Sequence, residues 1–132
     1  MICEICGISY EGLGHNAFPL TVGECCETCN EKAVIPYRLY KLGLNEREGL
    51  IIRPDNSISI IKPQSNRFSL KELQDYVEGY IEYYPTGNKK YDIIVNEEGL
   101  IMRLPFNTLT SKLFGIHTVG NVLIIPKRVS LT

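Results

Sequence analysis

This sequence has almost no excess of charge of either sign, and that argues against two classes of function. Its 132 residues carry 14 lysines and arginines against 15 acidic residues, for a formal net charge of −1. A nucleic-acid-binding protein usually has a marked basic excess, because contacts with phosphate supply most of its affinity. A mimic of DNA would instead carry a large acidic excess. We therefore expect neither direct binding of nucleic acid nor imitation of it.

The two parts of the chain are close to neutral as well. Residues 1–44 hold 3 basic and 5 acidic residues, a net charge of −2, whereas residues 45–132 hold 11 and 10, a net charge of +1. Neither part therefore offers the basic surface that binding to nucleic acid requires.

Long apolar segments and a leader are also missing. No run approaches the ~20 apolar residues of a membrane span, and the N-terminus has neither the basic nor the apolar region of a signal peptide. We therefore expect a protein of the reducing cytosol with no contact with a membrane. In that compartment, clustered cysteines indicate metal binding more often than disulfides.

The motifs of several enzyme classes are absent. The sequence contains no Walker glycine loop, no Gly-x-Ser-x-Gly and no His-Glu-x-x-His. Glu97 and Glu98 are adjacent in a Gly-containing segment, which indicates hairpin-turn residues rather than a general acid–base pair. Cys25 would form a nucleophile–base pair with His15 or His117 only by spatial coincidence. We predict that the protein is not an enzyme.

Two Cys-x-x-Cys motifs are the most informative feature that is present. The first consists of Cys3 and Cys6 and the second of Cys26 and Cys29, with 19 residues between them. Four thiolates at this spacing can bind one tetrahedral Zn²⁺ ion at ~2.3 Å per sulfur. A catalytic zinc normally keeps one position open for water, whereas thiolates here fill all four. The predicted zinc is therefore structural.

Two other residues offer alternative ligands. Cys25 could replace Cys26, but the two-residue spacing to Cys29 favours Cys26, so Cys25 is expected to be a free thiol beside the site. His15, in the Gly-rich stretch between the motifs, could substitute for one cysteine.

Residues 1–44 are predicted to form a zinc-binding module. Gly7 and Asn30 follow the two motifs, and both residue types tolerate the positive φ that turns backbone N–H groups toward sulfur. Short extended segments are expected between the motifs, followed by a helix that begins at the second motif and is interrupted by Pro36. This order is typical of a treble-clef or zinc-ribbon-like module. Because so short a module has little apolar surface, metal binding worth about 10–16 kcal/mol would stabilise it.

Residues 50–132 are predicted to form a small α+β domain that contains a mixed sheet and two short helices. The segment 45–49 is the expected boundary. Ser69 and Glu72 form a capping box for a helix from Leu70 to about Val77, and Gly79 is expected to end it. The other predicted elements are a hairpin of Leu50–Arg53 with Ser57–Ile61, a strand over Tyr80–Tyr84, a hairpin of Tyr91–Val95 with Leu100–Leu104, a helix over Thr108–Phe114 capped by Asn107, and a strand over Val122–Ile125.

Tyrosines are concentrated in the middle of the chain and suggest a contact surface. In a strand over residues 80–84, Tyr80, Glu82 and Tyr84 share one face. That face is too polar for a core, and tyrosine is enriched at protein interfaces. We predict that these three residues bind a partner; the other interpretation is that the tyrosines cover one side of a sheet.

Several motifs resemble an uncharacterised family of domains of unknown function (3846-type) found in phages and their Gram-positive hosts. The resemblance rests on Phe68-Ser69-Leu70-x-x-Leu73-Gln74, Gly79-Tyr80-Ile81-Glu82, Val95-Asn96-Glu97-Glu98-Gly99, Leu104-Pro105-Phe106-Asn107 and Gly120-Asn121-Val122-Leu123. The N-terminal segment, Cys3–Cys29 followed by Val34-Ile35-Pro36-x-Arg38-Leu39, is similar to the zinc-binding N-terminus that often precedes this domain in phage proteins.

The resemblance implies a small accessory phage protein that acts in the bacterial cytosol of the host. Such proteins frequently counter host defence, and a zinc-containing anti-CRISPR protein of streptococcal phages is similar in size and kind. We therefore expect a non-enzymatic inhibitor that binds a host defence protein, most specifically a Cas9-type nuclease whose DNA loading or activation it blocks. Two alternatives remain open: a zinc-ribbon regulator that binds nucleic acid, and a sponge or hydrolase for a signalling nucleotide.

Overall fold

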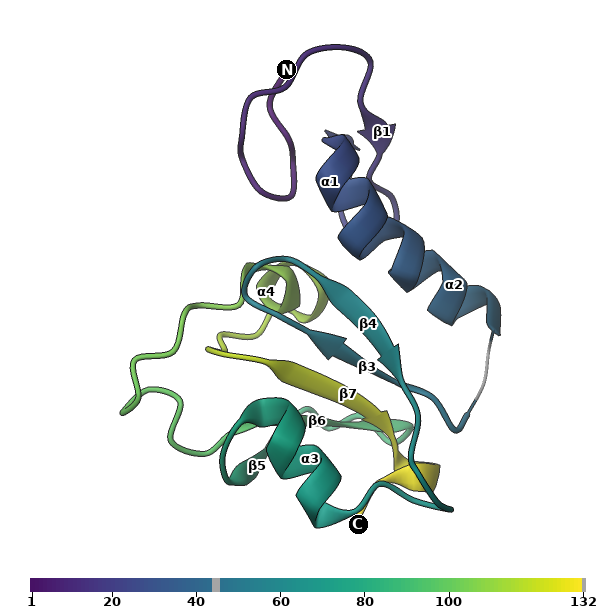
Figure 1. Cartoon of the computed structure of the whole chain (residues 1–132), viewed down its shortest axis with the longest axis vertical. Coiled ribbons are helices and arrows are strands. Elements are labelled where there is room, and N and C mark those ends of the chain that lie inside the picture. The colour runs from purple at the N-terminus through teal and green to yellow at the C-terminus, as the bar shows by residue number, and fades with distance from the viewer. Residues whose placement is uncertain (44–45, 132) are drawn as a thin grey trace.

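The computed structural model in Figure 1 describes residues 1–43 and 46–131, which form a mixed α/β structure with a two-stranded and a five-stranded sheet. Leu44 and Asn45, at the predicted boundary between the two parts, and the terminal Thr132 lie outside the described residues.

The N-terminal part is a small hairpin followed by one long helical segment, and the remainder alternates strands with short helices. The elements are β1 (His15–Asn16), β2 (Glu24–Cys25), α1 (Glu27–Cys29), the π-helical turn η1 (Asn30–Val34), α2 (Ile35–Gly43), β3 (Gly49–Ile52), β4 (Ile58–Ile61), α3 (Leu70–Val77), β5 (Ile81–Tyr84), β6 (Tyr91–Asn96), α4 (Thr108–Phe114), β7 (Val122–Pro126) and the 3₁₀ turn η2 (Lys127–Val129). None of the helices in the described ranges has the length and apolar character that crossing a membrane requires.

The five-stranded sheet is antiparallel throughout, with the strand order β4-β3-β7-β6-β5, so the mixed sheet predicted from the sequence is wrong. Strands distant in sequence form its centre, since Ile51 of β3 lies opposite Leu123 of β7, and Ile93 of β6 lies opposite Ile124. Strand β5 is at one edge of the sheet and β4 is at the other.

The inner strands bury apolar side chains on both faces of the sheet. Successive strand residues point to opposite faces, so Leu50 and Ile52 belong to one core cluster while Ile51 belongs to the other. The N-terminal part and α4 lie over the first face, and α3 lies over the second (Figure 1). The sheet is therefore the middle of three layers.

Three predictions from local sequence are confirmed. Strands β3 and β4 form the predicted hairpin, with Asn56 at φ 70° in its turn. Ser69 and Glu72 make both hydrogen bonds of the capping box at the start of α3. Asn107 caps α4 through a hydrogen bond from the backbone N–H of Thr110 to its side-chain oxygen.

The predicted strand over Leu100–Leu104 is wrong. This segment forms turns, in which the N–H of Met102 donates to the carbonyl of Glu98 and that of Leu104 to Gly99. Strand β6 pairs instead with β7 and β5, so it has no free edge for Leu100–Leu104. Leu100 and Ile101 consequently remain 82% exposed each.

Two helix ends also differ from expectation. Pro36 does not interrupt the N-terminal helix, because the π-helical turn before it places Pro36 in the first turn of α2, where no N–H donor is needed. At the end of α3, Glu78 and not Gly79 adopts the left-handed conformation, at φ 61°. Gly79 is required there for space, since a Cβ would lie 2.6 Å from the side-chain nitrogen of Asn96.

Asn107 should be one of the most sensitive polar residues in the fold. It is fully buried, and its side-chain nitrogen donates to the carbonyls of Ile52 and Gly120, both at 2.9 Å. The variant Asn107→Ala leaves two buried acceptors unpaired and removes the cap of α4, so we expect a loss of about 3 kcal/mol in the free energy of unfolding. Urea denaturation measures this loss. Asn66→Ala, at an exposed position, is the control, and equal stability of the two variants would contradict the prediction.

Candidate metal centre

The first Cys-x-x-Cys motif forms a tight backbone turn around its own sulfur. The N–H of Cys3 donates to the carbonyl of Ile8 and the N–H of Gly7 to that of Cys3, both at 2.9 Å. Gly7 has φ +80°, the positive value that the sequence predicted. The N–H groups of Ile5 and Cys6 then point at Cys3 Sγ, each 3.4 Å away. Such N–H groups stabilise a negatively charged sulfur.

The second motif lies at the start of the long helical segment. Cys26 occupies the N-cap of α1 in an extended conformation, and Cys29 is the last residue of α1. Asn30, where the sequence suggested a positive φ, is helical at φ −60° because the chain continues directly into η1. A hydrogen bond from the N–H of Glu4 to the carbonyl of Glu24 joins the first motif to strand β2, directly before the second motif.

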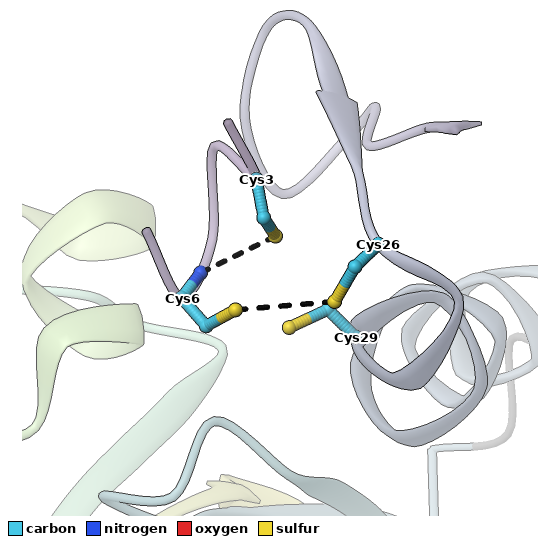
Figure 2. Close-up of side chains that lie close together, drawn as sticks. All are labelled: Cys3, Cys6, Cys26 and Cys29. Atoms are coloured by element: carbon cyan, nitrogen blue, oxygen red, sulfur yellow. Dashed lines mark hydrogen bonds between the residues drawn. The ribbon is translucent and has the colours of Figure 1, made fainter. Parts of the chain in front are cut away.

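The four sulfurs converge on one point (Figure 2). The Sγ atoms of Cys3, Cys6, Cys26 and Cys29 all lie within 4.8 Å of one another, and Cys6 and Cys26 are 3.9 Å apart. In a tetrahedron with metal–sulfur bonds of ~2.3 Å, the sulfurs are about 3.8 Å apart. The donor set therefore fits one four-coordinate metal ion with all positions filled by the chain.

The electrostatics of the cluster favour a bound cation. Burial raises the pKa of Cys29 and of Cys6 above the usual thiol value. At Cys3 burial acts in the same direction, but backbone N–H groups outweigh it and lower the pKa to about 6. Because thiolates this close repel one another, a divalent cation is the charge that would let all four lose their protons together.

The alternative ligands lie outside the cluster. Cys25 is fully buried beside it, and burial raises the pKa of its thiol to about 11. His15 pairs with Cys25 across the β1–β2 ladder but is exposed and is not part of the four-sulfur group. His117 lies elsewhere, with its ring 6.0 Å from that of Phe106. Among the described residues, the cluster therefore contains Cys26 rather than Cys25.

Arg38 of α2 holds the loop between the motifs. Its guanidinium donates to the carbonyl of Phe18 at 2.7 and 2.9 Å and to the carbonyl of Asn16 at 2.9 Å. The spacing of the cysteines gives no indication of this role for Arg38. In the sequence, Arg38 stood out only as one of the residues on which the family resemblance rests.

Two lysines connect the cysteine-containing N-terminal part to the rest of the chain. Lys112 of α4 donates to the backbone carbonyl of Glu4, next to Cys3, and Lys32 of η1 donates to the carbonyl of Asp55 in the β3–β4 turn. The cysteines also belong to the same core cluster as Leu50 of the sheet. The site is thus packed against the sheet.

The three predicted partner-binding residues lie along the β5 edge of the sheet. Glu82 and Tyr84 line one pocket of about 380 Å³, together with the exposed side chains of Leu100 and Ile101. Tyr80, which is 63% exposed, precedes β5 and lines a separate hollow at the end of α3. The structure therefore brings Glu82 and Tyr84 together, with Tyr80 beside them.

These features define a mixed α/β protein whose N-terminal four-cysteine centre packs on an antiparallel sheet. Residues 47–128 match the family described as Domain of unknown function (DUF3846), and the chain belongs to this family. Searches of curated proteins and of solved structures found no match.

Single cysteine substitutions test which sulfurs bind the metal. We expect Cys26→Ser to lose most of its bound metal, because a hydroxyl is a poor replacement for thiolate, and Cys25→Ser to retain one ion per chain. Elemental analysis of the purified proteins measures the metal content, and the thiolate-to-Co²⁺ absorption band of cobalt-loaded protein reports the ligands. Metal loss in Cys25→Ser with retention in Cys26→Ser would reverse the assignment.

Proposed function

We propose that this protein is a zinc-stabilised module that binds a partner protein and catalyses no reaction. The observation that supports partner binding is the pocket at Glu82 and Tyr84, beside which Leu100 and Ile101 are each 82% exposed. Exposed apolar side chains next to tyrosine and unpaired charge are typical of interaction surfaces.

Zinc is the proposed metal because the donor set is soft and tetrahedral. Four thiolates favour Zn²⁺ or iron over the hard cations that prefer oxygen ligands. The order of the first motif, the β1–β2 hairpin and a helix that carries the second motif supports a treble-clef type of module. With no ligand position left for water, the ion would stabilise the fold rather than activate a substrate.

The nucleophile–base pair that the sequence allowed does not favour catalysis. Cys25 faces His15 across the ladder, but the thiol is fully buried and its pKa is raised to about 11 by that burial. A catalytic cysteine needs the opposite, an accessible sulfur with a lowered pKa. This supports a binding role.

The partner that we propose to test first is a host defence protein, with a Cas9-type nuclease as the most specific candidate. The support for this choice is the resemblance to small phage proteins together with the near-neutral charge of −1. A neutral inhibitor would act by covering a protein surface, and so block DNA loading or a conformational step, rather than by competing as a polyanion.

Removal of the metal should unfold the N-terminal part and uncover one face of the sheet. Ile5, Val34 and Tyr37 belong to the cluster that also contains Leu50 and Ile124 of the sheet, so their departure exposes apolar surface. We expect a zinc chelator to lower the melting temperature by more than about 10 °C and to increase the fluorescence of an apolar dye, with recovery when Zn²⁺ is added back. An unchanged melting curve after verified metal removal would contradict a stabilising role.

Binding to the partner is tested with purified protein and with lysate of the natural host. We expect capture of one defence protein, retention of a purified Cas9-type nuclease, and loss of binding in Cys26→Ser/Cys29→Ser. Tyr80→Ala or Tyr84→Ala should weaken binding about tenfold while the melting temperature stays within a few degrees. Leu42→Ala is the control, since this 79% exposed residue lies on α2, which packs against the opposite edge of the sheet.

Other outcomes would replace the proposal. Salt-dependent retention of DNA or RNA with no captured protein would favour the nucleic-acid-binding regulator. A thermal shift caused by a signalling nucleotide, again with no captured protein, would favour the nucleotide sponge or hydrolase. Unchanged partner binding by both tyrosine variants would exclude that surface.

A further inference from the structure

Strand β5 is the open edge of the five-stranded sheet. It is hydrogen-bonded to β6 on one side, and in the described part of the chain no strand lies on its other side. The opposite edge differs, because η1 and α2 of the N-terminal part pack against β4. Ile58 and Ile61 of β4 are buried, whereas none of the four residues of β5 is, so β5 is the more accessible edge for another strand to join.

The register of the ladder shows which peptide groups of β5 face outward. The N–H of Glu97 donates to the carbonyl of Tyr80, and Glu82 and Tyr84 follow at intervals of two along the same ladder. Hydrogen-bonded pairs alternate in an antiparallel ladder, so these residues direct their peptide groups toward β6. The N–H and C=O groups of Ile81 and Tyr83 consequently point away from the sheet, and they offer two donors and two acceptors to an added strand.

The side chains beside this edge favour a basic partner residue. Glu82 and Glu97 both line the pocket of about 380 Å³, and no salt bridge within residues 1–43 and 46–131 involves either of them. Tyr84 and Leu100 supply apolar walls to the same pocket. Apolar walls and two carboxylates suit the aliphatic stem and charged end of lysine or arginine.

A second copy of this chain is poorly suited to the edge. Symmetric antiparallel pairing centred on residue 82 places Glu82 directly opposite Glu82, which is repulsive. Centred on residue 83, it places Ile81 opposite Pro85, which has no N–H to donate. Centred on residue 81, it requires the N–H of Gly79, which already donates to the carbonyl of Gln74 at 3.1 Å. Each register that uses the outward peptide groups thus has a defect that a foreign strand would avoid.

We propose that β5 binds an extended segment of a partner protein as a sixth strand, with a lysine or arginine of that segment opposite Glu82. This inference rests on the proposed function and specifies the chemistry of its partner: the main chain of the segment pairs with Ile81 and Tyr83, and the basic side chain enters the pocket between Glu82 and Glu97. Main-chain pairing provides affinity in such complexes, and the pockets that receive alternate side chains provide selectivity.

The first test selects ligands from a displayed library of random eight-residue peptides with the full-length, metal-loaded protein. We expect the enriched peptides to contain lysine or arginine at one fixed position with apolar residues two positions away. In a synthetic copy of the best peptide, N-methylation of an amide that faces β5 should weaken binding about tenfold, and N-methylation of the adjacent amide should change it little. No enrichment, enrichment without a basic residue, or equal tolerance to methylation at every amide would overturn the inference.

Variants of the edge provide a second, independent test with the same peptide. Ile81→Pro removes an outward N–H without removing a hydrogen bond to β6, and Ile81→Ala is the matched control that loses the side chain but keeps the N–H. We expect loss of binding only in the proline variant. Glu82→Lys should weaken the basic peptide about tenfold and strengthen a copy that carries glutamate at the same position. Equal affinities of all these variants would overturn the inference, and the methylation series decides it if Ile81→Pro does not fold.

Failure of this inference can be distinguished from failure of the proposed function. A captured partner protein that binds Ile81→Pro and Glu82→Lys as well as it binds the unmodified protein would overturn the β5 contact and leave partner binding in place. A peptide that binds the edge as described, with no protein captured from host lysate or bound among defence proteins, would overturn the proposed inhibition and leave the strand-binding edge.

Discussion

The structure depends on covering a sheet whose inner strands are apolar on both faces. Strand β3 shows this most clearly, since Leu50, Ile51 and Ile52 are each at most 2% exposed although neighbours point to opposite sides. Helix α3 and the 3₁₀ turn η2 contribute to one cover, and the other consists of α4 together with the cysteine-containing N-terminal part. The family match begins only at residue 47. Residues before position 47, which lie outside the family match, therefore cover part of the apolar surface of the matched domain.

The cysteine cluster is the point from which the N-terminal cover is organised. The two strands of its hairpin, β1 and β2, have two residues each, so regular hydrogen bonding contributes little there. Order comes from other contacts: N–H groups directed at Cys3 Sγ, the Arg38 guanidinium on two loop carbonyls, and the convergence of four sulfurs. Lys112 and Lys32 then fix the cover to the rest of the chain. A metal ion bound by these sulfurs would therefore stabilise the sheet indirectly, because it would hold together the N-terminal part that covers one face of the sheet.

The same arrangement makes the two edges of the sheet different. The N-terminal part packs against β4, whereas no strand in the described residues pairs with the outer side of β5. Glu82 and Pro85 lie at or beside the positions of β5 where a second copy would pair. Charged residues and proline are common protections of edge strands against self-association. The segment after β6 adds exposed Leu100 and Ile101 beside the open edge because β7 has taken the position next to β6. The pairing of β7 with β6 thus determines both which strands form the centre of the sheet and which apolar side chains remain exposed beside β5.

The sequence alone determined the features that depend on near neighbours. The first Cys-x-x-Cys turn, the hairpin turn at Asn56, the capping box at Ser69 and the cap at Asn107 each follow from hydrogen bonds within a few residues. Only the tertiary structure decided that β7 lies between β3 and β6, that Leu100–Leu104 is not a strand, and that the N-terminal part packs on the sheet. These outcomes depend on which of several segments far apart in the chain pairs with a given strand. Local hydrogen-bonding patterns carry no information about that choice.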